Sequence, residues 1–352
     1  MKIDERKLNE FVEKAVTDLA AGYGGVMTVL GHKLGLYKVM ANAGPLDSSE
    51  VAERSGCAER YVREWLNSQA AAGYVIYHPT SATYELTPEQ SLVLADDDSP
   101  VFMPPAWEVP VSMFFDEEKT MNAFRTGIGV AWDEHNDRLF CGVAAFYRNA
   151  YRNSLVREWL PALRGVEEKL RAGAKVADVG CGHGHSTILM AEAFPKSHFW
   201  GFDYHDKSIE SARSSAQNRA IENRVRFELA NATTYRTDSF DLICFFDCLH
   251  DMGDPVSAAR HARTALAEDG TVMLVEPFAH DRVEENLNTV GRLYYSASTT
   301  LCCAHALSED GAVALGAQAG EACLASVFKK AGFREFRRAK STPFNLILEA
   351  KA

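Results

Sequence analysis

The sequence predicts an α/β protein with a largely parallel, doubly wound sheet in its C-terminal half, a winged helix near its N-terminus and a helical segment between them. From Lys175 onward, short apolar runs alternate with helical segments, and a glycine-rich turn follows the first of these runs. Before residue 95, two short helical segments precede a stretch with hairpin spacing. Strands that alternate with helices form parallel sheets with right-handed crossovers.

Composition limits the class of protein. The chain has 352 residues, of which 47% are hydrophobic and 24% charged, as in soluble globular proteins of two domains. No apolar run approaches the roughly 18 residues of a membrane helix, and the charged start MKIDERKLNE differs from a signal peptide. We therefore expect a cytoplasmic protein without a membrane partner. The eight cysteines lack CxxC or zinc-finger spacing, so reduced thiols and no metal are expected.

Residues 1–95 are predicted to form the winged-helix domain. Residues 8–43 have helical apolar spacing, and Ser48 or Ser49 is expected to cap a short helix that stops at Gly56. A second helix then places four side chains on one face: Tyr61, Val62, Trp65 and Leu66. The following YVIYHPTSATYELT alternates like a hairpin around a Pro-Thr-Ser turn.

The charge of this domain bears on its partner. Residues 46–90 contain seven acidic side chains against three arginines and no lysine, a net charge of -4, within a chain of net charge -11. Binding DNA requires several phosphate contacts from basic side chains. Nucleic acid is therefore an unlikely partner, and dimerisation is the favoured use of the domain.

Residues 96–173 form a middle segment that begins with DDDSP and is rich in aromatic side chains. We expect helices that serve as a linker or a lid, covering another domain and lining a substrate pocket. The candidate pocket residues are Trp132, His135, Tyr147 and, from a later helix, Tyr294. His135 is also an alternative base if the segment closes over the pocket.

Residues 174–352 carry the sheet. Five apolar runs predict its first strands, namely KVADVG, HFWGFDYH, VRFELAN, FDLICFFDC and TVMLVEP. Helices are predicted between them at 186–194, 206–219 and 255–268. The tail FREFRRAKSTPFNLILEAK reads as two strands joined at a proline turn, an antiparallel hairpin at the sheet edge.

The stretch ADVGCGHGHS, residues 177–186, lies between the first strand and the first helix of this sheet. Doubly wound folds bind nucleotides at this point. Gly180, Gly182 and Gly184 form GxGxG, whereas a dinucleotide fingerprint would have its third glycine at His185. S-adenosylmethionine fits this pattern, because its methionine portion needs a close backbone but no diphosphate clamp.

Polar residues at the ends of the following strands extend this prediction. Asp178 suits the positive end of the cofactor, directly or through water. Asp203, 23 residues after Gly180, can accept both ribose hydroxyls. The other candidate cofactor residues are Tyr204 for stacking on adenine, Asn231 with Ala232 for the adenine edge, and Asp247 for the amino group or for orienting a base.

DVGCGHG, Asp203 and the closing hairpin resemble class I S-adenosylmethionine-dependent methyltransferases across roughly residues 150–352. The whole chain is similar to plant-type small-molecule O-methyltransferases, whose N-terminal domain forms dimers and contributes to the pocket. FFDCLHDMGDP and LGAQAGEA, followed by TPFNLILEA, resemble still more closely a bacterial group of winged-helix methyltransferases often labelled as transcriptional regulators. The resemblance implies a Rossmann-like, seven-stranded sheet of order 3-2-1-4-5-7-6, methyl transfer and a homodimer.

The segment FFDCLHDMGDP, residues 245–255, is where the chemistry is expected. His250 is the candidate general base, since a hydroxyl acceptor must lose a proton. His250 and Asp251 match the His-Asp motif of the plant-type enzymes, but Met252 stands where they have tryptophan. Glu276, which closes the fifth strand, is a candidate partner of the histidine.

The acceptor is expected to be a hydroxyl, a thiol or a small nitrogen on a small molecule, because FFDC replaces the NPPY-type run of many amino methyltransferases. Aromatic residues of the middle segment favour a planar or apolar substrate. Two other functions stay open: a DNA-binding regulator that senses S-adenosylmethionine, and a methyltransferase fold with non-methylating chemistry. Cys248, Cys302 and Cys303 are expected to act as small buried hydrophobes rather than as a thiol site for a soft metal, because neighbouring residues on a helix point about 100° apart.

Overall fold

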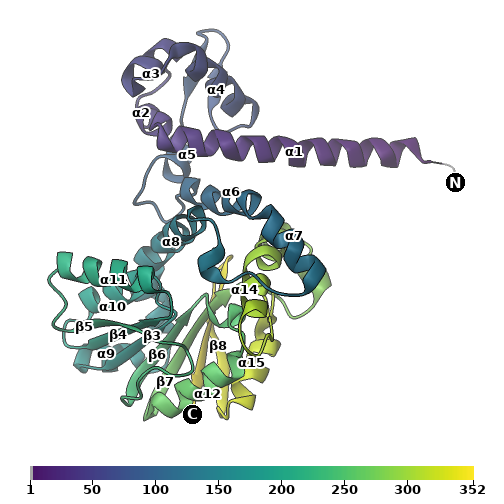
Figure 1. Cartoon of the computed structure of the whole chain (residues 1–352). Coiled ribbons are helices and arrows are strands. Elements are labelled where there is room, and N and C mark those ends of the chain that lie inside the picture. The colour runs from purple at the N-terminus through teal and green to yellow at the C-terminus, as the bar shows by residue number, and fades with distance from the viewer. Residues whose placement is uncertain (1–2) are drawn as a thin grey trace. The chain divides into compact units, whose positions relative to one another are not determined.

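The computed structural model describes residues 3–352, apart from the side chain of Cys141 (Figure 1). The chain forms two compact units. The first runs to Val111 and includes Arg138–Asn149, and the second comprises Ser112–Asp137 and Ala150–Ala352. The middle segment of the sequence is thus shared between the two units. In the described residues, we find no helix with the length and hydrophobicity that a membrane crossing requires.

The first unit has the predicted order of helices followed by a hairpin. Its helices and strands are α1 Glu5–Lys33, α2 Leu36–Met40, α3 Ser48–Ser55, α4 Glu59–Ala71, β1 Ile76–His78, β2 Thr83–Glu85, α5 Pro88–Leu94 and most of α8 Arg138–Ala150, while α6 Glu108–Phe115 begins in it. β1 and β2 pair antiparallel, as expected of a wing. Val51 of α3, Leu66 of α4 and Tyr37 of α2 share one buried apolar cluster.

Two local predictions in this unit were wrong. The residue that caps α3 is Asp47, not Ser48 or Ser49, because its carboxylate accepts the N–H groups of Ser49 and Glu50 while Glu50 binds back to the cap. Tyr61 does not join the buried face of α4. Its side chain is 81% exposed, whereas Val62, Trp65 and Leu66 are buried with Gln69.

The second unit is built around the sheet. Its helices and strands are α7 Glu117–Thr126, α9 Val166–Ala172, β3 Lys175–Val179, α10 His185–Ala193, β4 His198–Asp203, α11 Asp206–Asn218, β5 Val225–Leu229, β6 Phe240–Phe246, α12 Pro255–Ala265, β7 Leu266–Pro277, α13 Thr289–Ala297, α14 Cys303–Ser308, α15 Gly320–Lys330, β8 Glu335–Ser341 and β9 Asn345–Lys351. All five predicted strands and the closing hairpin are present.

The seven strands lie in the order β5-β4-β3-β6-β7-β9-β8, which is 3-2-1-4-5-7-6 when numbered within the sheet. β3 to β7 are parallel, and β9 and β8 are antiparallel to their neighbours. Helices cover both faces (Figure 1). Ala177 and Val179 of β3 face a core shared with α12 and α15, while Asp178 between them points to α10. The carboxyl ends of the central parallel strands therefore meet at one edge, where the predicted site residues lie.

Candidate active site

The glycine run forms the turn between β3 and α10. Gly180, Gly182 and Gly184 all have positive φ, at 75°, 51° and 75°, which side chains other than glycine rarely adopt. A Cβ at Gly180 would meet Cys248 at 2.8 Å, and one at Gly184 would meet Phe227 at 2.5 Å. A Cβ at Gly182 would meet nothing within 4 Å. Gly180 and Gly184 thus allow close internal packing, and Gly182 borders open space that a ligand can use.

Asp178 holds this turn in place. Its Oδ2 atom accepts the hydroxyls of Ser186 and Thr187, both at 2.6 Å, in the first turn of α10. The side chain is fully buried, and burial raises the pKa of Asp178 to about 6. Its Oδ1 atom has no hydrogen-bond partner among residues 3–352. The contact with the positive end of the cofactor stays a prediction, and an unsatisfied buried oxygen fits it.

Asp203, the last residue of β4, lies beside the same turn. Its two oxygens accept the N–H groups of Gly182 and His205, both at 2.8 Å. Burial raises the pKa of Asp203, and the two N–H groups oppose this effect. Each carboxylate oxygen can accept a further hydrogen bond. A carboxylate next to an open glycine suits the ribose hydroxyls of S-adenosylmethionine.

The residue after Asp203 is already stacked on a histidine. The ring of Tyr204 lies parallel to that of His305 on α14, with the centroids 5.8 Å apart, and its hydroxyl is 3.3 Å from Nε2. Trp132 packs edge-on against both His305 and His135, at 5.9 and 6.2 Å. Stacking of Tyr204 on adenine stays a prediction, and one face of its ring is covered by His305.

His135 is buried and paired with Asp116. Nδ1 of His135 lies 3.2 Å from Oδ2 of Asp116. Burial lowers the pKa of His135, although Asp116 opposes the effect. Burial likewise lowers the pKa of His305, and Glu309 opposes it. Nε2 of His135 and Nδ1 of His305 are buried without a hydrogen-bond partner in the described part of the chain.

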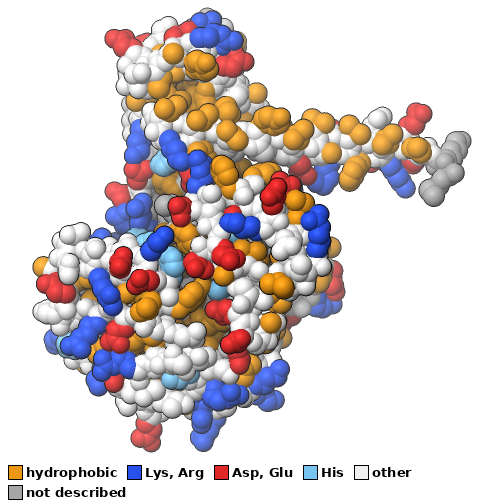
Figure 2. Space-filling model, in the orientation of Figure 1, with side chains coloured by type: hydrophobic (Ala, Val, Ile, Leu, Met, Phe, Trp, Pro, Cys, Tyr) orange, Lys and Arg blue, Asp and Glu red, His pale blue; other side chains and the backbone are white. Residues whose placement is uncertain are grey.

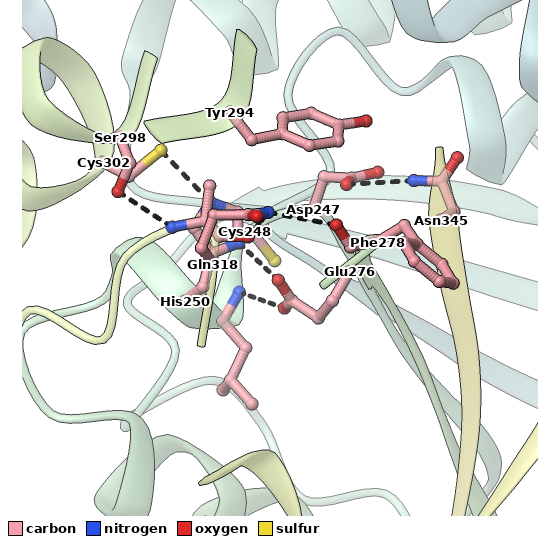
Figure 3. Close-up of polar contacts among 12 residues, drawn as sticks. Asp247, Cys248, His250, Glu276, Phe278, Tyr294, Ser298, Cys302, Gln318 and Asn345 are labelled. Atoms are coloured by element: carbon pink, nitrogen blue, oxygen red, sulfur yellow. Dashed lines mark hydrogen bonds and ion pairs between the residues drawn. The ribbon is translucent and has the colours of Figure 1, made fainter. Parts of the chain in front are cut away.

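The remaining predicted residues lie at strand ends or on helices. Asn231 follows β5, and its Oδ1 accepts the N–H of Thr233 at 3.1 Å; Ala232 between them is half-buried. Asp247 follows β6 and accepts the amide of Asn345 at 3.3 Å, beneath the buried ring of Tyr294 (Figure 3). Tyr147 lies on α8 in the first unit, edge-on to Phe146. The roles of these residues stay predictions.

His250 and Glu276 form the best-defined polar contact at this edge of the sheet (Figure 3). Nδ1 of His250 pairs with Oε2 of Glu276, and both side chains are almost completely buried. Oε1 of Glu276 accepts the N–H of Leu249 at 3.1 Å. Burial disfavours a charged imidazole, but the Glu276 carboxylate and the Cys302 sulfur together outweigh this and raise the pKa of His250 well above its usual value.

Asp251 is not the acid that contacts the histidine ring. Burial raises the pKa of Asp251 to about 7; His250 opposes the shift, and Glu276 and Glu309 add to it. The carboxylate on Nδ1 is that of Glu276, which comes from the neighbouring strand β7. A catalytic role for Asp251 stays a prediction, and Glu276 has the position of the orienting acid.

Two side chains near this site were not among the predicted site residues, although Cys302 had been considered as a metal-binding thiol. Sγ of Cys302 lies 3.3 Å from Nε2 of His250, so this thiol is more than a small hydrophobe. His305 stacks on Tyr204 three residues further along the same helical stretch. Cys302 and His305 are spaced i, i+3, which puts both on one helix face. This spacing is the sequence pattern from which they could have been predicted.

Comparisons with known proteins identify two domains in the chain. A model of a methyltransferase domain matches residues 170–332, and a model of an Rv2258c-like winged helix-turn-helix domain matches residues 22–96. A 27-O-demethylrifamycin SV methyltransferase of Amycolatopsis mediterranei is 35% identical over 107 residues, which is 30% of this chain and 39% of that protein. The chain thus aligns with less than half of the length of this curated relative.

Solved structures share the fold over almost the whole chain. Human N-acetylserotonin methyltransferase in complex with S-adenosylmethionine has a TM-score of 0.70 at 16% identity, covering 97% of both chains. An O-methyltransferase of neocarzinostatin biosynthesis, in complex with S-adenosylmethionine and 2-hydroxy-5-methyl naphthoic acid, has a TM-score of 0.62 at 16% identity, covering 96% of this chain and 98% of that one. Residues 170–332 are therefore a methyltransferase domain, and residues 22–96 before it are an Rv2258c-like winged helix-turn-helix domain.

Proposed function

We propose that this chain transfers a methyl group from S-adenosylmethionine to a hydroxyl of a small, planar or apolar molecule, with His250 as the general base. The observation that carries this proposal is the buried pair of His250 and Glu276 beside the glycine turn. When bound, the cofactor supplies an electrophilic methyl group. The protein's task is to hold the acceptor in line and to remove its proton.

In this proposal the residues have separate tasks. Glu276 fixes the imidazole through Nδ1, which leaves Nε2 of His250 as the nitrogen that faces an acceptor. We assign Asp203 and the open side of Gly182 to binding of the cofactor; the hydrogen bond between Asp203 and Gly182 and the space beside that glycine support this. Because its pKa is raised, His250 accepts a proton from the acceptor only in the fraction of molecules in which it is neutral, and that fraction grows with pH.

The class of acceptor rests on the pocket residues and on the structural relatives. Trp132 and Tyr204 supply aromatic surface near the carboxyl ends of the strands. The neocarzinostatin enzyme of the same fold holds a hydroxylated naphthoic acid. A phenol or another hydroxylated aromatic compound is the acceptor class that we propose to test first.

We also propose that the chain acts as a homodimer through α1. The helix exposes a stripe of large hydrophobic side chains at Leu8, Val12, Val16, Leu19, Tyr23, Val26 and Leu30 (Figure 2). Their spacing of three or four residues is that of a coiled-coil seam. A seam of this kind is self-complementary, so a second copy of α1 is the occupant that fits it.

The arginines of α4 support a small-molecule enzyme rather than a DNA-binding regulator. Arg63 donates to Glu59 at 2.8 Å, and Arg60 pairs with Glu64 at 2.5 Å, each one turn away on the same helix. Each of these guanidinium groups has a carboxylate beside it, which opposes the approach of a phosphate. A gel-shift assay at low salt is expected to show no retention of duplex DNA.

The test of the proposed activity uses S-adenosylmethionine with a labelled methyl group and a panel of hydroxylated aromatic compounds. We expect labelled methyl ethers from the wild-type protein. His250→Ala is expected to lose at least about 100-fold in turnover while its calorimetric affinity for S-adenosylmethionine is kept. His135→Ala serves as the control, and a larger loss there than in His250→Ala would transfer the role of base to His135. The absence of any methylated product across the panel would refute the proposal.

A further inference from the structure

The thiol of Cys302 lies on the one ring nitrogen of His250 that Glu276 leaves available (Figure 3). Sγ of Cys302 is 3.3 Å from Nε2 of His250, while Glu276 holds Nδ1. A base that takes a proton from a hydroxyl must place that hydroxyl within hydrogen-bond distance of the same nitrogen. The sulfur therefore lies next to the place that an acceptor's oxygen needs.

A local change in helix geometry brings Cys302 there. Ser298–Cys302 form a π-helical turn between α13 and α14, and such turns occur frequently at functional sites. Cys302 faces His250, whereas the next residue, Cys303, lies 3.5 Å from the hydroxyl of Ser298. The two neighbouring thiols thus have different partners, and only one of them contacts the histidine.

The loop 309–319 is hydrogen-bonded to both segments that make this contact. The N–H of Gly316 donates to the carbonyl of His250 at 3.0 Å, and the N–H of Ala317 donates to the hydroxyl of Ser298 at 3.0 Å. Gln318 donates to the carbonyl of Phe278 at 3.0 Å. One short loop therefore joins the turn of His250, the π-helical turn and the end of β7.

We propose that Cys302 is a positioning residue, whose sulfur holds Nε2 of His250 in place until the acceptor's hydroxyl replaces it. The inference rests on the proposed function. A thiol is a weak donor and a weak acceptor, so it can face both the neutral and the protonated ring and can be displaced by a hydroxyl. A serine at this position would make a stronger hydrogen bond and would compete with the acceptor.

The groups around His250 determine in which direction substitution of Cys302 shifts the pKa of the histidine. Glu276 comes from β7, Asp251 follows His250, and Glu309 binds the N–H of Gly253 at 2.7 Å. None of these is changed by substitution of Cys302. Removing the sulfur takes an acceptor from the protonated ring and lowers the pKa of His250, whereas a serine oxygen accepts more strongly and raises it.

The experiment compares Cys302→Ala, Cys302→Ser and the control Cys303→Ala with the wild type. The pH profile of kcat/KM is measured with one acceptor that the wild type methylates. The titration of His250 is followed by NMR on protein with ¹⁵N-labelled histidine. In both measurements we expect the midpoint pH to increase in the order Cys302→Ala, wild type, Cys302→Ser. The midpoint of Cys303→Ala should equal that of the wild type. At pH 7, Cys302→Ser is expected to lose about tenfold in kcat/KM.

Any other order of midpoints, or a loss of about 100-fold or more in Cys302→Ala, overturns the proposal. Thermal unfolding and the affinity for S-adenosylmethionine show that each variant is folded. If Cys302→Ser does not fold, the comparison of Cys302→Ala with Cys303→Ala decides the question alone. The NMR titration needs no turnover, so it tests Cys302 even if the wild type methylates no hydroxyl and the proposed function fails.

Discussion

Glu276 holds the imidazole of His250 by its Nδ1 atom, from the end of a neighbouring strand. The same carboxylate accepts the N–H of Leu249, so it fixes both the ring and the backbone turn that carries it. An acid placed in this way orients a histidine and stabilises its protonated form. The pair therefore determines both the geometry and the pH range of the proposed base.

Glu276→Gln is expected to lower kcat by at least about tenfold and to move the rise of activity to lower pH. The sign follows from the raised pKa of His250, to which the charged Glu276 carboxylate contributes more than a neutral amide would. The pH profile of kcat with saturating substrates measures this. A profile that keeps its midpoint would show that His250 does not limit the rate.

The pair of His250 and Glu276 should also affect how the free energy of unfolding depends on pH. A histidine with a raised pKa contributes stability that is fully present below its unfolded pKa and is lost as pH rises through the folded value. Urea unfolding of wild type and Glu276→Gln should therefore differ most at acidic to neutral pH and converge at alkaline pH. A difference in the free energy of unfolding between the two proteins that widens as pH rises would contradict the pairing.

Asp203→Ala is expected to weaken the affinity for S-adenosylmethionine by about 10-fold or more, because the ribose hydroxyls and the N–H of Gly182 lose their acceptor. Turnover at saturating cofactor should change less. Isothermal calorimetry measures the affinity. Asp206→Ala is the matched control, since Asp206 is exposed in the first turn of α11, and an equal loss there would remove the specific role of Asp203.

The glycines of the turn are expected to respond differently to alanine. Gly184→Ala places a Cβ 2.5 Å from Phe227 and should destabilise the fold by about 2 kcal/mol or more. Gly182→Ala meets no atom, so its cost should be limited to about 1–2 kcal/mol of backbone strain, with a separate loss of cofactor affinity. Thermal unfolding without cofactor and calorimetry separate the two effects. Equal melting temperatures would refute the distinction.

Leu19→Asp is expected to dissociate the proposed dimer, because it places a charge in the middle of the apolar stripe of α1. Ala21→Asp adds the same charge to an exposed position on the opposite side of the helix and should leave the dimer intact. Sedimentation velocity at micromolar concentration distinguishes the two variants. A wild-type protein that sediments as a monomer would refute the dimer.

The sheet was predictable because its signals are local. Runs such as KVADVG and FDLICFFDC are short, apolar and bounded by turn residues, and each became a strand within a few residues of its predicted ends. β7 starts five residues before the predicted TVMLVEP, where a register shift against β6 lets LAEDG continue the strand. The order of strands came from the resemblance, and the structure has that order.

The site was less predictable, because it depends on contacts between distant segments. The contact between Glu276 and His250 was predictable because Glu276 closes the fifth strand, next to the strand that leads into His250. Cys302 is 52 residues from His250, and its contact leaves no local pattern. The prediction that Tyr61 is buried was wrong because helical spacing does not show where the edge of a buried face lies. Asp178 was expected at the cofactor, but its hydroxyl partners on α10 follow it by eight and nine residues and occupy one of its oxygens.

Gly129 and Val130 pack closely against α14. The N–H of Val130 donates to the carbonyl of Ala304 at 2.9 Å, and a Cβ at Gly129 would lie 2.0 Å from that carbonyl. The same short helix begins one residue after Cys302 and carries His305. A change in the backbone at Gly129 and Val130 would have to be matched by a change in this helix, so the two segments should covary during evolutionary divergence.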